Sequence, residues 1–235
     1  MNVLITGASK GIGFELVQKF AHNKQNRVVA LARDMEQLKT LQSICKKKYN
    51  NTIEVYALDF LSENIAQQIV DLLTTLNCHF DMVVNNAGCL INKPFATTSA
   101  KDVFKTFQTN VFAPILLIQQ IIPLLNETKW SHIVNIGSMG GYQGSVKFPG
   151  LSIYSASKAA LASLTECLAE EYKDRKVSIN CLALGAVQTE MLSKAFPGFQ
   201  AQVSAQQMAE YIYNFSIQNF YYITGKVIPV ARLTP

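Results

Sequence analysis

The fold is decided near the amino terminus, where an apolar run leads into a glycine-rich loop in Val3-Leu4-Ile5-Thr6-Gly7-Ala8-Ser9-Lys10-Gly11-Ile12-Gly13. The run favours a buried strand, and the residues after the loop have apolar side chains at helical spacing, at Phe14, Leu16, Val17 and Phe20. A helix that begins there offers free N–H groups and a partial positive charge, which suit a pyrophosphate. The loop has three residues between its first two glycines, instead of the one in the commonest dinucleotide-binding fingerprint. The stretch therefore predicts a strand, a dinucleotide-binding loop and a helix.

The alternation of short apolar runs with longer amphipathic segments continues along the chain. Seven runs predict strands: Val3–Ile5, Arg27–Leu31, Ile53–Leu58, Met82–Val84, His132–Ile136, Val177–Leu182 and Lys226–Val230. The segments between them predict helices near 11–23, 35–48, 63–76, 100–125, 155–173 and 205–217. This order implies the α/β class, with a Rossmann-type doubly wound sheet of about seven parallel strands and helices on both faces. Since no linker-like composition divides the 235 residues, we expect a single domain over 1–235.

A doubly wound sheet binds its ligand outside the carboxyl ends of its strands. Two glycine clusters lie at such ends: Gly7, Gly11 and Gly13 after the first strand, and Gly137, Gly140, Gly141, Gly144 and Gly150 after the fifth. Ordinary turn chemistry would explain one cluster more easily than both. Both loops therefore lie where we expect the ligand to bind.

Composition narrows the function further. A hydrophobic content of 49% predicts a large core, and the net charge of +5 is spread along the chain, so no nucleic-acid partner is expected. The five cysteines form no CxxC pair and the three histidines are scattered, which predicts reduced, mostly buried thiols and no metal site. The apolar run begins too close to Met1 for a targeting peptide, and the apolar stretch 111–125 is short and broken for a membrane span. We therefore expect a cytoplasmic protein with no membrane partner.

The end of the second strand decides which dinucleotide is preferred. An acidic residue there would accept hydrogen bonds from the 2′-hydroxyl of NAD, but Arg33 occupies this region and no acid stands at Ala32. Arg33 and Lys10 together suit a 2′-phosphate. Asp34 is explained by the spacing Asp34-x-x-Gln37, which is typical of a helix cap and directs the carboxylate to backbone N–H groups. We therefore expect NADP(H) in preference to NAD(H).

Linked motifs extend the pattern over residues 2–190. They are TGASKGIG at 6–13, Asp59, Asn85-Asn86-Ala87-Gly88, Asn110, Ser138 and Tyr154-Ser155-Ala156-Ser157-Lys158. Each alone also fits ordinary turn, capping or helix-surface chemistry. Together, in this order and spacing, they resemble the short-chain dehydrogenase/reductase family. The resemblance implies an NADP(H)-dependent oxidoreductase that interconverts a carbonyl and an alcohol of a small-molecule substrate.

Tyr154 and Lys158 lie one helical turn apart, so they share a helix face. A free tyrosine has a pKa near 10, which is too high for ready proton exchange at neutral pH. An ammonium about 4 Å away contributes roughly 4 kcal/mol at an effective dielectric near 20, or about three pKa units before desolvation subtracts. The pair therefore predicts a Tyr154 pKa near 7.

The resemblance implies a role for each motif residue. Tyr154 would exchange a proton with the substrate oxygen, Ser138 would stabilise the charge on that oxygen, and Lys158 would also bind the nicotinamide ribose. Asn110 would position a water that connects Lys158 to solvent. Contacts to the cofactor are implied for Gly7, Ser9, Lys10, Gly11, Ile12, Gly13, Arg33, Asp59, Asn86, Ala87, Gly88, Tyr154, Lys158, Gly185, Val187 and Thr189.

The chain departs from the family pattern in three places. Leu184-Gly185 replaces the usual Pro-Gly, which predicts a less rigid segment before Thr189. Ser138 and Tyr154 are sixteen positions apart, a little more than is common, and the extra residues within 141–150 predict a loop at the substrate mouth. The segment 225–235 lacks the usual Asp-Gly-Gly ending, and the substrate loop near 190–204 is short. We therefore expect a shallow, open substrate site.

Two predicted helices have surfaces suited to assembly. The segment 111–125 is strongly apolar and 156–169 carries several alanines, which predicts a homodimer or homotetramer, with packing on the sheet alone as the alternative.

A different class of function, an NADP(H)-binding regulatory or sensor protein without turnover, also fits the fold. The set Asn110, Ser138, Tyr154 and Lys158 favours the enzyme, because a sensor needs no proton-transfer pair.

Overall fold

The computed structural model describes residues 1–218 and 220–232. Its centre is a seven-stranded sheet in the order β3-β2-β1-β4-β5-β6-β9, and each pairing within it is parallel. The strands are β1 (Asn2–Thr6), β2 (Arg27–Ala32), β3 (Glu54–Ala57), β4 (Met82–Asn85), β5 (Ser131–Ser138), β6 (Val177–Leu184) and β9 (Val227–Val230). The strand order reverses between β1 and β4, so the predicted Rossmann-type sheet is confirmed.

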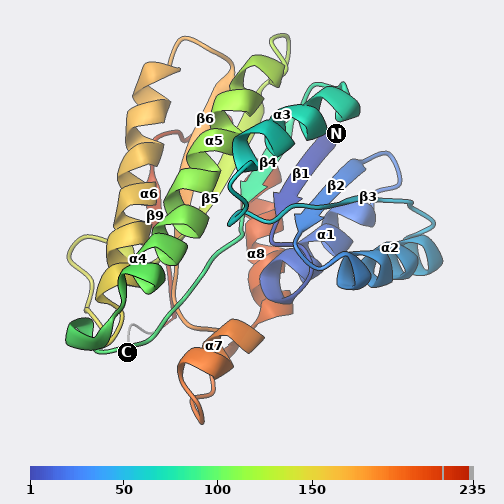
Figure 1. Ribbon diagram of the computed structural model, residues 1–235. Helices are drawn as coiled ribbons and strands as arrows, with labels where there is room; N and C mark the ends of the chain where they lie inside the picture. Colours follow the sequence, from blue (N-terminus) through green and yellow to red (C-terminus); the bar gives the residue numbers. More distant parts are fainter. Residues whose placement is uncertain (219, 233–235) are drawn as a thin grey trace.

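Helices cover both faces of the sheet (Figure 1). One face packs against α1 (Gly11–Ala21), α2 (Met35–Tyr49) and α8 (Ala205–Gln218). The other carries α3 (Ile65–Leu76), α4 (Ala100–Phe107), α5 (Ala113–Ile121) and α6 (Ser152–Glu171). Because both faces are covered, the central strands are buried along their length, including all eight residues of β6. All five cysteines are free, with Cys45 and Cys181 buried and Cys167 exposed, so fewer thiols are buried than predicted.

The predicted helix over 100–125 is interrupted around Asn110. After α4 comes a turn of π-helix, η2 (Gln108–Phe112), followed by α5 and the 3-10 turn η3 (Ile122–Leu124). Pro114 lies in the first turn of α5 and has no N–H to donate to the Asn110 carbonyl four residues earlier. Asn110 itself is fully buried at this wider turn. Turns of this kind are frequent at functional sites.

The helical run over residues 100–124 is, within the described chain, the one helix with the length and composition needed to cross a membrane. Its mean hydropathy is 1.3 in the most apolar window, and 44% of that window is buried inside the fold. A core helix of a globular protein has the same composition. In this structure the run packs against α3 and α6.

The predicted substrate loop near 190–204 contains regular structure. α7 (Glu190–Ala195) begins at Thr189, whose hydroxyl accepts a hydrogen bond from the Leu192 N–H at 3.2 Å. A parallel pair of short strands, β7 (Val187–Gln188) and β8 (Val203–Ser204), closes the base of the segment. Figure 1 shows α7 beyond the carboxyl ends of the sheet strands. A helix of six residues is too short to give a clear sequence period.

A buried histidine lies at the amino-terminal end of β5. His132 is 1% exposed, its Nδ1 lies 3.1 Å from the Ser216 carbonyl oxygen, and its Nε2 lies 3.1 Å from the Asn180 side-chain nitrogen. A neutral imidazole with its proton on Nδ1 satisfies both contacts. Burial lowers the pKa of His132 to about 4, because the charged ring would lose its hydration among protein atoms.

This histidine predicts acid sensitivity of the fold. An unfolded histidine titrates near pH 6.5, so between that pH and the folded pKa of about 4 the unfolded chain binds a proton that the folded chain does not. We expect the free energy of unfolding to fall by about 3 kcal/mol over this range on account of His132, measured by urea unfolding. His132→Gln should flatten the profile relative to the wild type, whereas His79→Gln, at an exposed position, should not. Parallel profiles for the wild type and His132→Gln would contradict this assignment.

Candidate active site

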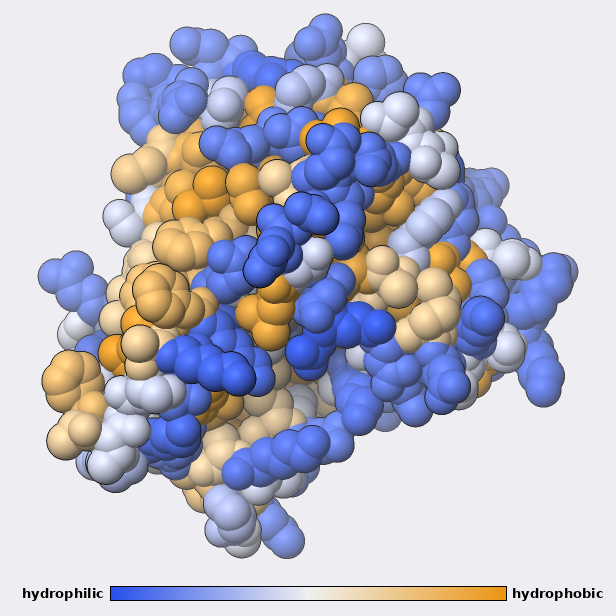
Figure 2. Space-filling view, viewed as in Figure 1, coloured by the Kyte–Doolittle hydropathy of each residue, from blue (hydrophilic) through white to orange (hydrophobic). Residues whose placement is uncertain are grey.

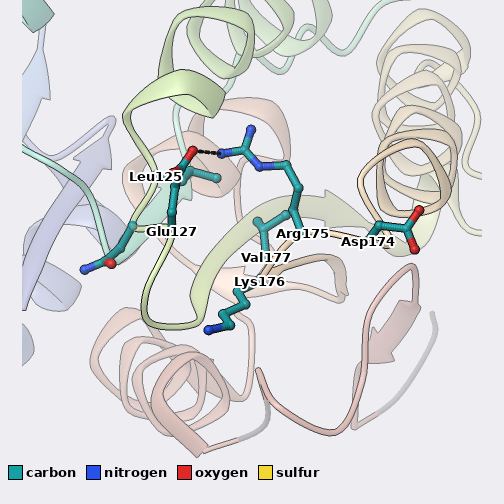
Figure 3. Close-up of a pocket in the computed structure, with 7 residues that line it drawn as sticks. Leu125, Glu127, Asp174, Arg175, Lys176 and Val177 are labelled. Atoms are coloured by element: carbon teal, nitrogen blue, oxygen red, sulfur yellow. Dashed lines mark ion pairs between the residues drawn. The ribbon is translucent and has the colours of Figure 1, made fainter.

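The residues predicted to form the site lie at the carboxyl ends of the strands, on both sides of the reversal between β1 and β4. A cleft of about 260 Å³ lies at the opposite end, where the chain enters β5 and β6, lined by 125–127 and 174–177 (Figure 3). Arg175 and Glu127 pair at its edge at 3.7 Å. This cleft contains none of the predicted site residues, so we place the candidate site at the carboxyl ends.

The loop between β1 and α1 requires glycine for close backbone approach. Gly7 has a φ of +68°, and a Cβ on it would lie 2.7 Å from the Cα of Ala87. A Cβ on Gly13 would lie 2.4 Å from the Gly7 carbonyl oxygen. Ser9 and Ile12 are half-buried in the same loop. Within the described residues no side chain caps the first N–H groups of α1, which leaves them available to an anion.

Asn86 holds this loop against the end of β4. Its side-chain nitrogen donates hydrogen bonds to the carbonyls of Thr6 at 2.9 Å and Gly7 at 3.2 Å. In return the Thr6 hydroxyl oxygen accepts the N–H groups of Asn86 and Ala87, at 3.1 and 3.0 Å. The Asn86 side chain therefore supports the glycine loop, and the implied contact of this residue with the cofactor stays a prediction.

The residues predicted to select the adenosine end lie after β2 and β3. Arg33 directly follows β2 and Asp59 follows β3, and both are exposed. One Asp59 carboxylate oxygen accepts a hydrogen bond from the Leu61 N–H at 3.1 Å. Asp34 caps α2 by accepting a hydrogen bond from the Gln37 N–H at 3.1 Å, which confirms its predicted role.

Lys10 is paired with a residue that the sequence did not single out. Its Nζ lies 3.0 Å from a carboxylate oxygen of Glu190, the first residue of α7. Lys10 is therefore engaged with Glu190 in this structure, and its contact with a 2′-phosphate stays a prediction. Thr189 also lies against the glycine loop, because a Cβ on Gly11 would be 3.3 Å from its methyl group. The start of α7 thus lies directly on the cofactor loop.

Tyr154 and Lys158 lie in the first two turns of α6, and Ser138 ends β5. The Ser138 hydroxyl lies close enough to the Tyr154 phenol to lower its pKa by hydrogen bonding. The 3-10 turn η4 (Met139–Gly141) follows Ser138, and a Cβ on Gly141 would lie 2.6 Å from the Lys158 carbonyl carbon. Backbone therefore packs on backbone between η4 and α6, which fixes Ser138 relative to Tyr154.

Burial sets the protonation of the two titratable groups. Lys158 is 4% exposed, and its Nζ donates to the Ile136 carbonyl at 2.7 Å. Burial lowers the pKa of Lys158 to about 8, while it raises the pKa of Tyr154 above its usual value of 10, against the effect of Ser138. The prediction of a Tyr154 pKa near 7 is therefore wrong here, because the ammonium is directed to a strand carbonyl and the phenolate is desolvated. A Cβ on Gly88 would lie 3.7 Å from the Lys158 Nζ, so this glycine leaves space beside the ammonium.

Asn110 joins the two halves of the site. Its side-chain oxygen accepts the Cys89 N–H at 2.7 Å, and its nitrogen donates to the Cys89 carbonyl and the Ser157 hydroxyl, both at 2.9 Å. Ser157 in turn donates to the Tyr154 carbonyl at 2.7 Å. The side chain thus clamps the loop after β4 to α6 and is not free to hold the water that the resemblance implied. Pro114 cannot donate an N–H to the Asn110 backbone carbonyl, and the contact of Asn110 with a water stays a prediction.

The segment after β6 is anchored by strand pairing. Leu184 is buried and lies opposite Val230, and the Gly185 N–H donates to the Val230 carbonyl at 2.9 Å. A Cβ on Gly185 would lie 2.8 Å from the Cβ of Ala231, so glycine permits this contact. Val187 is buried in β7. The start of this segment is therefore held in place although leucine replaces proline.

Sequence reasoning missed several residues that build the site. Thr6 and Ser157 stand inside the quoted motifs, where a hydroxyl beside a glycine loop or a catalytic pair is a usable signal. Cys89 contributes through its backbone N–H and carbonyl, which pair with Asn110. Since every residue except proline has both groups, the residue type does not indicate this role. Glu190 contributes through a contact between segments distant in sequence, which no local pattern indicates.

The fold and this cluster define a dinucleotide-binding protein of the Rossmann type with serine, tyrosine and lysine at one edge. A family model described as short chain dehydrogenase matches residues 1–199. Human retinol dehydrogenase 8 is 32% identical over 98% of this chain and 70% of its own length, and the 3-oxoacyl-[acyl-carrier-protein] reductase FabG of Aquifex aeolicus is 29% identical over 97% and 94%. A putative short chain dehydrogenase from Escherichia coli CFT073, solved with NADPH, superposes with a TM-score of 0.87 at 27% identity, over 97% of this chain and 95% of its own. The chain belongs to the short-chain dehydrogenase/reductase family.

Proposed function

We propose that this protein is an NADP(H)-dependent oxidoreductase that interconverts a carbonyl and an alcohol, with Tyr154 as acid and base. The observation that supports this most is the convergence of Tyr154, Ser138 and Lys158, which η4 and α6 hold together by backbone contact. The family supports oxidoreduction in general. The assignment of the proton-transfer residues rests on their geometry.

The cradle after β1 fits a dinucleotide. Gly7 and Gly13 stand where a Cβ would clash, and the uncapped N–H groups of α1 suit its pyrophosphate. Arg33 supplies a cation after β2 for a 2′-phosphate, and the relative solved with NADPH supports the same preference. When bound, the nicotinamide would supply a hydride to the substrate carbon or accept one from it. A lower Michaelis constant for NADH than for NADPH would contradict the preference.

The protein's own groups act on the substrate oxygen. Tyr154 Oη would donate its proton to the carbonyl oxygen, while the Ser138 hydroxyl donates a hydrogen bond to the same atom and stabilises its developing charge. Lys158, buried and cationic at neutral pH, would hold the ribose hydroxyls beside them. The Asn110 carbonyl would hold a water that returns a proton to Tyr154 by way of Lys158 and the ribose hydroxyls.

The direction of the pKa shifts favours carbonyl reduction at neutral pH. Since burial raises the pKa of Tyr154, its phenol is protonated and ready to act as an acid. The alkoxide formed in reduction is a much stronger base than a phenolate, so it accepts the proton readily. Oxidation of an alcohol would first require loss of that proton, which the buried site disfavours.

The rim of the site favours an apolar substrate. Three segments meet there: the Lys93 N–H donates to the Gly150 carbonyl at 3.0 Å, and the Asn92 side chain donates to the Ala195 carbonyl at 2.9 Å. Large apolar side chains are exposed on these segments and their flanks, namely Phe95, Val146, Met191 and Phe199. We therefore propose an aldehyde or ketone with a hydrophobic chain that covers these residues.

The test is NADPH oxidation against aldehydes and ketones of increasing chain length. Because each methylene removed from water contributes about 0.8 kcal/mol, we expect kcat/KM to rise by about two- to fourfold per methylene until the rim is covered. A flat series would contradict the apolar rim as a substrate contact. If the protein binds NADPH yet is inert on every compound, the sensor function replaces the enzyme.

We also propose that the protein is a homo-oligomer that associates through α4, α5 and α6. Phe104 is 71% and Phe112 45% exposed, and Ala156 and Ala159 are exposed on α6. Figure 2 shows hydrophobic side chains gathered over α5 and α6 on this face. Light scattering should give a multiple of the 26.0 kDa chain mass, and Phe104→Glu should reduce it. A 26.0 kDa species alone at micromolar concentration would contradict the proposal.

A further inference from the structure

The contact between Lys10 and Glu190 joins two segments with different tasks. Lys10 precedes the first turn of α1 in the cofactor loop, and Glu190 begins α7 on the rim of the substrate site. Their charged atoms lie 3.0 Å apart, and the other Glu190 carboxylate oxygen lies 3.1 Å from Lys194 Nζ. The contact therefore ties the cofactor loop to the rim helix.

The packing around this pair holds Glu190 where it can reach Lys10. Thr189, the residue before it, approaches Gly11, with 3.3 Å between its methyl group and a Cβ built on that glycine. At the other end of α7 the Ala195 carbonyl accepts a hydrogen bond from Asn92 at 2.9 Å. Because α7 is held at both ends, the backbone at Glu190 lies beside the loop, and from there the carboxylate reaches Lys10.

We propose that Glu190 sets the cofactor preference of this protein by competing with a 2′-phosphate for Lys10. This inference rests on the proposed use of NADP(H). Glu190 neutralises the charge of one of the two cations, Lys10 and Arg33, that would attract the phosphate, so it weakens NADP(H) binding. Binding of NAD(H), which has no 2′-phosphate, does not draw on Lys10 and is unaffected. The native preference for NADP(H) over NAD(H) is thus smaller than the glycine loop and Arg33 would give if Glu190 were absent.

The test compares the dissociation constants of NADPH and NADH in wild type and in Glu190→Gln, measured by titration. Exposed ion pairs contribute little, so we expect Glu190→Gln to lower the NADPH dissociation constant by about two- to fivefold and to leave that of NADH unchanged. In Lys10→Gln the additional change Glu190→Gln should have no further effect on NADPH. Circular dichroism and melting temperature check that the variants are folded.

Glu210→Gln is the matched control. It removes the same charge from another ion pair, Lys19 with Glu210, which joins α1 to α8 away from α7. If Glu210→Gln tightens NADPH binding equally, net charge explains the effect and the proposal is overturned. It is also overturned if Glu190→Gln leaves NADPH binding unchanged or weakens it. The proposed NADP(H) preference is tested by the dissociation constants of NADPH and NADH in the wild type alone. The role of Glu190 is tested by the ratio of the NADPH dissociation constants of variant and wild type.

Discussion

Tyr154→Phe is expected to lower kcat for carbonyl reduction by about 10²- to 10⁴-fold, the usual contribution of a positioned general acid. The change removes only the phenolic oxygen, so the ring still fills its place on α6 beside Ser138. The substrate oxygen then lacks its proton donor while its hydrogen bond from Ser138 remains. Stopped-flow or steady-state NADPH oxidation with the best substrate measures the loss.

Binding must be separated from chemistry in this variant. We expect the NADPH dissociation constant to stay within about twofold of wild type, because Tyr154 contributes to turnover mainly through its proton. Tyr172→Phe, at the carboxyl end of the same helix, is the matched control and should retain full activity. Retention of more than a tenth of wild-type kcat by Tyr154→Phe would show that another group supplies the proton.

Gly141→Ala is expected to reduce kcat/KM by about 10²-fold, although Gly141 itself performs no chemistry. Its added Cβ would lie 2.6 Å from the Lys158 carbonyl carbon and from the Ala159 nitrogen, so η4 must move away from α6. That movement carries Ser138 away from Tyr154, and a displacement of about 1 Å at a reacting centre costs this much. The glycine loop after β1 is not touched, so NADPH binding should weaken much less than kcat/KM falls, even though the added Cβ also presses on Lys158.

Gly144→Asn separates this effect from a general sensitivity of the loop. Gly144 has a φ of +79°, which asparagine tolerates better than most residues, and no heavy atom lies within 4 Å of a Cβ there. We expect wild-type activity for Gly144→Asn. Equal losses in the two variants would mean that loop disorder, and not the spacing between η4 and α6, controls the rate.

The fold followed from the sequence because its signals are local. Each strand is a short apolar run and each long helix has a hydrophobic face. The succession of strands and helices along the chain from β1 to β6 was therefore predictable before any contact was known. The Asp34 cap was predictable for the same reason, since its partner N–H lies three residues away. Helix α7 and the π-turn at Asn110 were not, because a six-residue helix and an inserted residue leave no period to detect.

The candidate site divides in the same way. The sequence predicted Ser138 at the end of one strand, and Tyr154 and Lys158 at the start of the helix that follows it. In a parallel sheet these positions meet at the carboxyl edge of the strands. It predicted the protonation of Tyr154 wrongly, because a charge pair on a helix says nothing of burial or of the Ile136 carbonyl that receives the ammonium. It also did not show that the Asn110 side chain is engaged with Cys89 and Ser157, because these hydrogen bonds join segments that are distant in sequence.

The sequence by itself thus determined the sheet, the glycine loop and the kinds of side chain available for chemistry, because these depend on residues close together in the chain. Only the tertiary structure decided which groups are charged, which are already engaged and which meet across the site. Lys10 illustrates the difference: its type predicted a phosphate contact, and its pairing with Glu190 depends on a helix 180 positions further along the chain. Electrostatic effects depend on burial and distance, which only the folded chain defines.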